Sequence, residues 1–461
     1  MNKTRLAIAL LGKGSANHLH RKDVVKTFLD NNFALTFLIR DDYRDLIAPL
    51  HGCEYTPITT PSHTTSHLRY LRGLFQYIRS LYPANDPAKR FVFNVRNKKR
   101  SLRAQIFHLT LRQLAKSRSL MTLLVVIEEK LYPKLKVEGI TPDSIDVICL
   151  IGFGGNEIRE AYLARWATQH RIPTINIVGN YDNLSTKGFR GFTLTHLAVW
   201  GESMRTDAET LQAIPKNNIH TVGSLRYNNL ESYISLTKKA FLERCNLNPN
   251  TPTILFGGGR DEFHYFEMLE VFQLLKKHHK LQLIIRVMPN KLLMQSPEIQ
   301  QLVQYIKSTE DVSLSIGDQS FLHGDTAQEP LAIEEFELWH SLKYCDLVIN
   351  LFSTLALEAC IFDKPVINMW YFRQPCRMML RGPVYDPYNI EQHIRRLKRF
   401  GATVDVESRD ELIRQTFHQL QYPDQRQVNR QRLVNHECGN LDGKAISRLL
   451  TLCQTCVKQT S

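Results

Sequence analysis

The sequence lacks a long hydrophobic run. Its longest apolar stretches, Met121–Ile127 and Asp346–Phe352, are far shorter than the ~20 residues that a membrane-spanning helix needs. The short run Leu6–Leu11 ends at a glycine-rich turn and not at a cleavage-like site, so we interpret it as a buried first strand instead of a signal peptide. We therefore expect a cytoplasmic protein, with a peripheral position at the inner face of the plasma membrane as a second possibility.

Several motifs that would point to metal or redox chemistry are also missing. There is no His-Glu-x-x-His, no paired Cys-x-x-Cys and no phosphate-binding loop ending in Gly-Lys-Ser/Thr. The nine cysteines are scattered, and Cys149, Cys345 and Cys360 lie in apolar runs, which predicts reduced core residues. The lone pair Cys453-x-x-Cys456 has no partner pair, so we interpret it as chance spacing. We expect no metal and no cofactor.

Acidic residues are absent from one long segment, although the net charge of the whole chain is +14. Residues 87–127 contain no Asp or Glu, and aromatic and aliphatic residues are interleaved with the basic ones. The segment is either a solvated helix face or a surface for anionic lipid or a polyanionic acceptor; no motif supports nucleic acid. Its basic residues are Lys89, Arg90, Arg96, Lys98, Lys99, Arg100, Arg103, Arg112, Lys116 and Arg118.

What the sequence does contain is an alternation of short apolar strands with amphipathic helices. This pattern, over 461 residues, predicts an α/β protein with parallel sheets covered on both faces. Each half contains a strand followed by a glycine turn and a helix, one beginning at Gly12 and one at Gly257. We therefore expect two Rossmann-like domains that face a central cleft.

The polar stretch 227–250 contains Asn-Pro-Asn-Thr-Pro and is the best linker candidate. It separates an N-terminal domain, 1–226, which we expect on the acceptor side, from a nucleotide-donor domain, 251–440. A last helix, 441–461, is expected to pack back on the N-terminal domain.

The segment Asn350–Ala359 carries the most informative pattern. A buried strand runs into the hydroxyl residues Ser353 and Thr354 at a helix start, where backbone N–H groups can hold a phosphate. Glu358 lies about one turn further, where a carboxylate could accept from ribose hydroxyls. A capped helix with a surface Glu explains the pattern equally well.

Two further features are candidates for the donor side. The turn Gly257-Gly258-Gly259-Arg260 allows close approach of a phosphate and adds a forked donor, although a plain strand–helix turn is the alternative. Arg286 ends the strand Leu281–Val287 and could neutralise a leaving nucleotide; a solvated strand-end arginine is the alternative.

Two loops are candidates for the acceptor side. Gly12 and Gly14 follow the first strand, and His18 beyond them has a suitable pKa for a base. The loop 180–188 follows another strand and offers Asp182, Asn183 and Lys187. Polar loops and isolated histidines are common, so a purely structural role is the alternative for both.

The chain resembles a bacterial group with the glycosyltransferase B-type fold, distantly similar to CDP-glycerol glycerophosphotransferases, capsule Kdo transferases and UDP-N-acetylglucosamine 2-epimerases. The resemblance spans most of the chain, and its most specific part is the loop 181–188, which resembles Trp-Asp-Asn-Leu-Ser/Thr-x-Lys-Gly with Tyr181 in place of Trp. The other matching segments are 69–72 with 77–79, 199–202, 222–224, 350–359 with 364–366, and 442–445.

The resemblance implies transfer from a nucleotide donor without an obligatory metal. One departure concerns the strand after which the group often has His-Pro, because this chain has Arg286-Val287-Met288-Pro289 and therefore no histidine there. Arg286 remains as a candidate.

We therefore predict a glycosyltransferase that moves a sugar from a nucleotide-sugar donor to a surface-polysaccharide or lipid-linked acceptor. Asp182, His18 and Lys187 are the candidate catalytic residues. The alternatives are a CDP-alcohol-dependent polyol-phosphate transferase, an epimerase, and a non-catalytic scaffold that binds polyanion or glycan. The predicted donor-binding residues are Gly257, Gly258, Gly259, Arg260, Arg286, Asn350, Ser353, Thr354 and Glu358, and the acceptor-side loop residues are Gly12, Gly14 and Asn183.

Overall fold

The structure of the chain is a computed structural model. It describes residues 3–460 except 12–18, 40–49, 59–65, 84–85, 87–88, 90–92, 95–96, 98–99, 132–135, 152–157, 259–262, 288–296, 316–329, 352 and 371–391. The chain divides into two compact units. Unit 1 comprises residues 1–228, 391–393 and 435–461, and unit 2 comprises residues 229–390 and 394–434.

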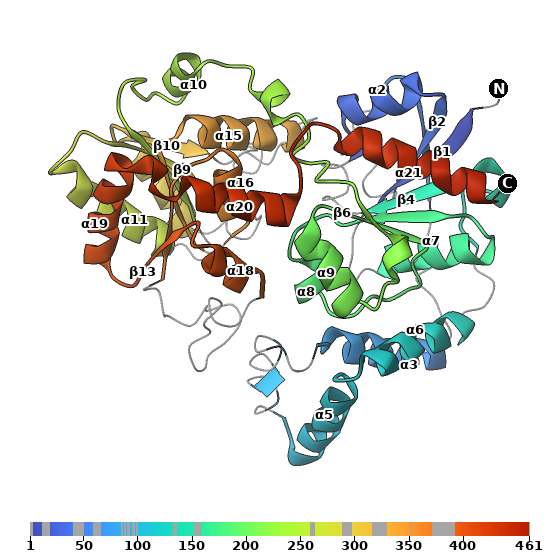
Figure 1. Ribbon diagram of the computed structural model, residues 1–461. Coiled ribbons are helices and arrows are strands. Elements are labelled where there is room, and N and C mark those ends of the chain that lie inside the picture. Colours follow the sequence, from blue (N-terminus) through green and yellow to red (C-terminus); the bar gives the residue numbers. More distant parts are fainter. Residues whose placement is uncertain are drawn as a thin grey trace. The chain divides into compact units, whose positions relative to one another are not determined.

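Unit 1 is built on a seven-stranded parallel sheet with the strand order β3-β2-β1-β4-β5-β6-β7 (Figure 1). The strands expected near Leu6, Ala34, Ile145, Pro173 and Leu197 are all present, whereas the short β3 and β7 were not expected. The strands are β1 (Thr4–Leu10), β2 (Phe33–Ile39), β3 (Cys53–Pro57), β4 (Val147–Ile151), β5 (Thr174–Ile177), β6 (His196–Val199) and β7 (Ile219–Thr221).

The C-terminal helix α21 (Ala445–Thr460) belongs to the core of unit 1. Together with α2 (Lys22–Asp30) it packs against the sheet through residues such as Phe28, Leu449 and Cys453, each 0 % exposed. Helix α7 (Ile158–Gln169) packs against β4 and β5. Unit 1 is therefore closed by a segment more than 200 residues away in sequence from the sheet that it covers.

A layer of three helices is attached to unit 1: α3 (Ser66–Ser80), α5 (Leu102–Leu114) and α6 (Arg118–Leu131) (Figure 1). They share a small core, which includes Ile78, Met121 and Val125 and also Phe189 from unit 1. A buried ion-pair triad ties the layer to α7, because Glu128 of α6 pairs with both Arg79 of α3 and Arg165 of α7. We call α3, α5 and α6 the helical layer.

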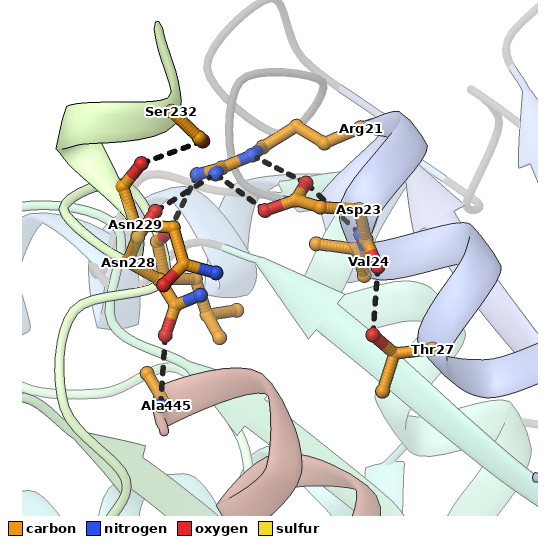
Figure 2. A network of polar contacts seen from close by, with 9 residues as sticks. Arg21, Asp23, Val24, Thr27, Asn228, Asn229, Ser232 and Ala445 are labelled. Carbon is orange, nitrogen blue, oxygen red and sulfur yellow. Dashed lines mark hydrogen bonds and ion pairs between the residues drawn. The ribbon is translucent and has the colours of Figure 1, made fainter. Parts of the chain in front are cut away.

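The chain leaves unit 1 at a polar junction (Figure 2). The guanidinium of Arg21, 8 % exposed, donates to Asp23 at the start of α2 and to the backbone oxygens of Leu225 and Asn228. The Asn228 side chain accepts a hydrogen bond of 2.9 Å from the backbone N–H of Ala445, the first residue of α21. Three segments distant in sequence are thereby joined at one point.

Unit 2 is built on a six-stranded parallel sheet with the order β10-β9-β8-β11-β12-β13. Helices α11, α13 and α19 pack against one face of this sheet. They bury the strand residues Phe256, Ile285 and Ile349 on that face. The strands are β8 (Thr253–Gly257), β9 (Gln282–Arg286), β10 (Val312–Ser315), β11 (Leu347–Asn350), β12 (Val366–Met369) and β13 (Val404–Val406); the helices are α11 (Phe263–Lys276), α13 (Pro297–Lys307), α15 (Pro330–Tyr344), α16 (Leu355–Ile361) and α19 (Arg409–Gln421).

The segment expected as a linker has structure of its own. Residues 227–250 contain the 3-10 helix η4 (Leu230–Tyr233) and α10 (Lys238–Arg244), whose Phe241 and Leu242 are buried. From Asn229 onward these residues belong to unit 2. The remaining elements are α8 (Asn183–Thr186), α9 (Glu202–Thr210), α18 (Gln392–Phe400), α20 (Gln427–Cys438), η2 (Pro142–Ser144), η3 (Lys216–Asn218) and η5 (Pro423–Arg426).

The described cysteines are free, and Cys149, Cys345 and Cys360 are buried as expected. Cys453 and Cys456 lie in the apolar core of unit 1, and burial raises the pKa of the Cys456 thiol to about 12. Among the helices that the structure describes, none is both long and apolar enough to span a bilayer.

Candidate functional site

The strand order of unit 2 identifies one edge of its sheet as the candidate site. Chain connections proceed outward in both directions from the pair β8 and β11, so the order reverses between these strands. In open parallel sheets, ligands bind beyond the carboxyl ends of the strands at such a reversal. The two loops predicted to hold a donor, after Gly257 and after Asn350, follow these two strands. The fold therefore brings both loops to one place.

A row of five polar residues and one glycine crosses the sheet at this edge. The strand registers place these residues side by side on six neighbouring strands, and neighbours in register point to the same face of a sheet. We call them the polar row; in spatial order they are Ser315, Arg286, Gly257, Asn350, Asn368 and Asp405.

One half of the polar row is a continuous hydrogen-bond network. Ser353 donates to the side-chain oxygen of Asn350 at 2.7 Å, and Asn350 donates to Asn368 at 3.4 Å. Asn368 in turn donates to Thr403 and to the Asp405 carboxylate, at 3.0 and 3.1 Å. Asn350 is 0 % exposed and Asn368 is 2 % exposed. Buried amides are costly unless they are bonded, so this network fixes the side chains at the end of β11.

The other half of the polar row carries the positive charge. Arg286, half-buried at the end of β9, donates to the Ser315 hydroxyl at 3.2 Å, and this hydroxyl donates to Glu337 of α15 at 2.9 Å. Arg286 and Asn350 lie two strands apart, which corresponds to roughly 10 Å between backbones. A diphosphate and an arginine side chain can together bridge that distance.

Packing explains why the first two positions of the glycine turn are glycine. A side chain at Gly257 would collide with Leu355 at the start of α16, and one at Gly258 would collide with the ring of Tyr265. Packing alone is therefore sufficient to require glycine at both positions, and phosphate approach at this turn stays a prediction. Gly259 and Arg260 lie outside the described residues.

The start of α16 is closed by Ser353. The Ser353 hydroxyl accepts from the N–H of Leu355 at 3.3 Å, and its backbone oxygen accepts from Ala356 at 3.1 Å. Thr354 stands at the N-cap without a side-chain capping bond. Glu358 is 4 % exposed, so it is not the surface residue of the alternative interpretation. The helix has only seven residues, and we therefore give its dipole little weight.

Asp405, at the end of the network, has a perturbed acidity. Burial raises the pKa of its carboxyl to about 6, against the smaller opposing effects of the bond from Asn368 and of the charge of Arg426. The residue therefore takes up a proton near neutral pH, in direct contact with the network that holds Asn350.

In unit 1, the loop after β5 carries Asp182. One oxygen of the Asp182 carboxylate accepts from the Thr186 hydroxyl at 3.0 Å. The other oxygen, Oδ1, is buried and has no hydrogen-bond partner among the described residues. A buried carboxylate oxygen without a donor is unusual, and it suits a group that accepts a proton from a ligand hydroxyl. Asn183 is buried beside it, and Lys187 is exposed.

Hydrogen bonds from Gln212 and Lys89 fix the backbone of the rest of this loop. Gln212, 0 % exposed, donates to the backbone oxygens of Leu184 and Gly188 at 2.7 and 2.9 Å. The Lys89 ammonium group donates to the backbone oxygen of Thr186 at 2.6 Å. Gly188 has φ +86°, and a side chain there would strike the backbone of Arg79. The loop is therefore a rigid support for Asp182.

The third predicted group lies outside the described residues, because Gly12, Gly14 and His18 fall in the segment 12–18. His20, just after it, contacts the Tyr55 hydroxyl at 2.9 Å. Burial lowers the pKa of His20 to about 4, so this ring is neutral at pH 7. In the described part of the chain, no cluster of three or more His, Cys, Asp or Glu could hold a metal ion.

Sequence reasoning missed Asn368, Asp405, Ser315 and Glu337. A polar residue inside an apolar run, as in Val-Ile-Asn-Met at 366–369, is a usable signal. That Asn368, Asp405 and Ser315 belong to one row depends on the register of six strands, and a single sequence does not specify that register. Glu337 reaches the row from helix α15.

Comparison with known proteins gives the fold. No family model matches the chain, and no curated protein matches it. A structure assigned as a UDP-N-acetylglucosamine 2-epimerase of Listeria monocytogenes aligns over 100 % of this chain and 98 % of its own, with TM-score 0.54 and 10 % identity. UDP-GlcNAc 2-epimerase from Neisseria meningitidis, bound to UDP-GlcNAc, gives 98 % and 100 % coverage, TM-score 0.52 and 14 % identity.

A glycosyltransferase from Rickettsia africae aligns over 99 % of this chain and 100 % of its own, with TM-score 0.50 and 11 % identity. At these identities the likeness concerns the fold, and it agrees with two parallel-sheet units that both have the Rossmann strand order. The chain has the glycosyltransferase B-type fold.

Proposed function

We propose that the protein is a glycosyltransferase that uses a nucleotide-sugar donor and a surface-polysaccharide or lipid-linked acceptor. The observation that carries the proposal is the polar row, because it places a cation, hydroxyls and buried amides at the strand reversal of unit 2. That is where sheets of this kind bind nucleotides.

In this proposal, unit 2 binds the donor. The Thr354 hydroxyl donates to the diphosphate, and the Ser353 hydroxyl turns its one proton from Asn350 to the diphosphate when the donor binds. Arg286 neutralises the charge that develops on the leaving nucleoside diphosphate. Because an arginine can supply this charge, the reaction is proposed to need no metal. Glu358 is assigned to the ribose, and the network through Asn350 and Asn368 keeps Ser353 in place.

Unit 1 is proposed to bind the acceptor. Asp182 would accept the proton of the attacking hydroxyl on its unpartnered oxygen Oδ1, while Thr186 holds the other oxygen. Asn183 and Lys187 are assigned to acceptor binding, and Gly12, Gly14 and His18 remain proposed members of the same side.

A turnover assay tests the proposal and separates it from its rivals. Purified protein is incubated with UDP-GlcNAc, the ligand of the Neisseria structure, and with other UDP-, GDP-, CMP- and CDP-activated donors, with and without bacterial lipid and glycan fractions. Acceptor-dependent release of a nucleoside diphosphate, or of CMP from a CMP-sugar, supports sugar transfer. Release of a monophosphate from a CDP-alcohol would instead indicate polyol-phosphate transfer, and conversion of the sugar without acceptor would indicate an epimerase.

The matched variants are Arg286→Ala, in the polar row, and Arg432→Ala, an exposed arginine of α20. We expect the first to lose turnover and the second to keep it. If the folded wild type turns over no donor and binds no nucleotide, the enzyme proposal is wrong and a non-catalytic scaffold replaces it.

A further inference from the structure

The helical layer of unit 1 turns large apolar side chains toward solvent. On α5, Leu102 is 72 % exposed, Ile106 is 58 % exposed and Leu109 is 42 % exposed. Their spacing of four and three residues places them on one side of the helix. Phe107 and Leu114, 47 % and 40 % exposed, form a second stripe, separated from the first by the positions of Arg103 and Thr110. Such a group of exposed apolar residues marks an interaction surface on a soluble domain.

The side of α5 that packs inward is much less apolar. Leu111 is its only buried residue within the helix, His108 meets the ring of Tyr77, and Ala115 follows at the helix end. Helices that serve only a protein core place their largest apolar residues inward. The arrangement on α5 is the reverse, so folding of this chain does not account for its outer face.

The charge around this face has one sign. Residues 87–127 contain ten Lys and Arg and no Asp or Glu. Arg103 on α5 and Lys116 just after it are exposed, whereas Lys89 and Arg118 are bonded to backbone oxygens of unit 1. The outer face therefore presents aliphatic side chains together with cations that have no acidic neighbours in this segment.

The combination of exposed aliphatic side chains and basic residues on α5 indicates which kind of partner can bind there. A second copy of the chain would bring the same positive segment against itself, which like-charge repulsion opposes. Nucleic acid or a polyanionic glycan would satisfy the cations but would leave five large apolar side chains uncovered. An anionic lipid surface satisfies both, because its headgroups attract basic residues and its acyl boundary accepts aliphatic ones.

We propose that α5 is a membrane-docking helix that lies in the interface of an anionic lipid bilayer. Leu102, Ile106 and Leu109 insert between the headgroups, and Arg103 and Lys116 contact lipid phosphates. In unit 1, α5 lies on the side of α3 and α6 that faces away from the sheet (Figure 1). The buried triad through Glu128 then links the docked layer to α7. The inference does not rest on the proposed reaction, because binding needs no donor.

Vesicle co-sedimentation tests the proposal with the full chain and no donor. The vesicles contain phosphatidylcholine alone or with phosphatidylglycerol. The apolar variant is Leu102→Ser/Ile106→Ser/Leu109→Ser, and its control changes exposed residues of unit 2, Tyr305→Ser/Tyr422→Ser/Val428→Ser, which are 44 %, 50 % and 66 % exposed. The basic variant is Arg103→Gln/Lys116→Gln, and its control is Lys277→Gln/Arg432→Gln.

We expect the wild type to bind anionic vesicles at least about tenfold better than neutral ones. The basic variant should lose about fivefold for each side chain removed, and the apolar variant should lose at least about tenfold. Both controls should stay within about twofold of wild type. Circular dichroism verifies that each variant is folded.

Three results would overturn the proposal. The first is a folded wild type that does not bind anionic vesicles. The second is vesicle binding that the apolar variant retains in full, together with equal binding to heparin or DNA, which would indicate a polyanion site. The third is a wild-type dimer that the apolar variant dissociates, without any vesicle binding, which would assign the face to self-association.

Discussion

The two sheets have the same parallel architecture and the same strand reversal, yet their carboxyl edges differ in chemistry. In unit 1 the last residues of four adjacent strands are Ile39, Leu10, Ile151 and Ile177, and all four are buried. In unit 2 the corresponding strands β9, β8, β11 and β12 end in Arg286, Gly257, Asn350 and Met369, so charged and amide side chains stand at two of these four positions. In unit 1, Asn176 is a buried amide one residue before the end of β5, and Asp182 lies in the loop beyond that strand.

The difference teaches where each unit can bind a ligand. A buried polar row destabilises a sheet unless its members are bonded. In unit 2, Asn350 donates to Asn368, Asn368 donates to Asp405, and Arg286 donates to Ser315. The polar row is therefore suited to binding the charged groups of a ligand directly at the strand ends. Unit 1 has apolar residues at the last positions of β2, β1, β4 and β5, and it presents one carboxylate, Asp182, from a loop. This contrast supports our proposal that unit 2 binds the nucleotide and that unit 1 carries out proton transfer.

The largest effect should come from the carboxylate of unit 1. Replacing Asp182 by Asn keeps the side-chain shape but removes the proton acceptor, so turnover should fall about 10²–10⁴-fold. Nucleotide affinity, measured by calorimetry, should stay unchanged. Asp143→Asn, an exposed aspartate of η2, is the control. Undiminished turnover in the Asp182 variant would contradict the proposal that unit 1 carries out proton transfer through this carboxylate.

The next largest effect should come from the cation of unit 2. Loss of a charge-assisted bond in Arg286→Ala should weaken nucleoside diphosphate binding about 10–100-fold. Arg286→Lys should fall between this variant and wild type, because lysine keeps the charge but not the forked geometry. Titration calorimetry measures both. Equal affinity in all three proteins would place the diphosphate elsewhere.

Making the edge of unit 2 apolar, like that of unit 1, should cost stability. In Asn350→Leu the Ser353 hydroxyl loses its acceptor and Asn368 loses a donor, so the free energy of unfolding should drop by about 1–3 kcal/mol. Chemical denaturation measures this change. The conservative change Leu10→Ile in unit 1, which replaces one buried aliphatic residue by another, should cost less. A variant as stable as wild type would show that the network contributes nothing.

The smallest effect should be a pH dependence confined to the polar row. The pKa of Asp405 is raised from 3.8 to about 6, so the folded protein holds this proton more tightly than the unfolded chain does. Its contribution to stability is greatest below pH 4 and is lost as the pH rises to about 6. The loss should be on the order of 1–2 kcal/mol, allowing for partial exposure.

Asp405→Asn removes this titration. The free energy of unfolding of the wild type, measured relative to that of the variant, should therefore fall as the pH is raised from 4 to 7. A difference that stays constant over this range would show that the carboxyl titrates normally.

The sequence predicted most of the fold because its strands are apolar and its turns contain glycine. It placed the strands at Leu6, Thr253 and Leu347 within two residues of their observed starts. It missed β3, β7 and β13, because the short runs Cys53–Pro57, Ile219–Thr221 and Val404–Val406 mix polar and apolar residues and depend on their neighbours for pairing.

The candidate site was predicted in part. Ser353 and Arg286 were recognisable because polar residues at strand ends are local signals. Asn368 and Asp405 were not, because their place beside Asn350 comes from strand register. The glycines at 257 and 258 were assigned to phosphate approach, and this stays a prediction. Their packing against Leu355 and Tyr265 was not predicted, because Leu355 belongs to another strand–helix unit and the direction of the Tyr265 ring is set by the fold.

Hydrogen–deuterium exchange tests the central claim most directly, because it locates a ligand without any substitution. Exchange is compared with and without a saturating concentration of the nucleoside diphosphate that most raises the melting temperature. We predict slower exchange in the segments after β8 and β11, around Gly258 and Ser353–Leu355, and unchanged exchange in the segments after β1 and β5 of unit 1. Protection after β1 or β5 instead, or no protection and no thermal shift with any nucleotide, would contradict the assignment of the donor to unit 2.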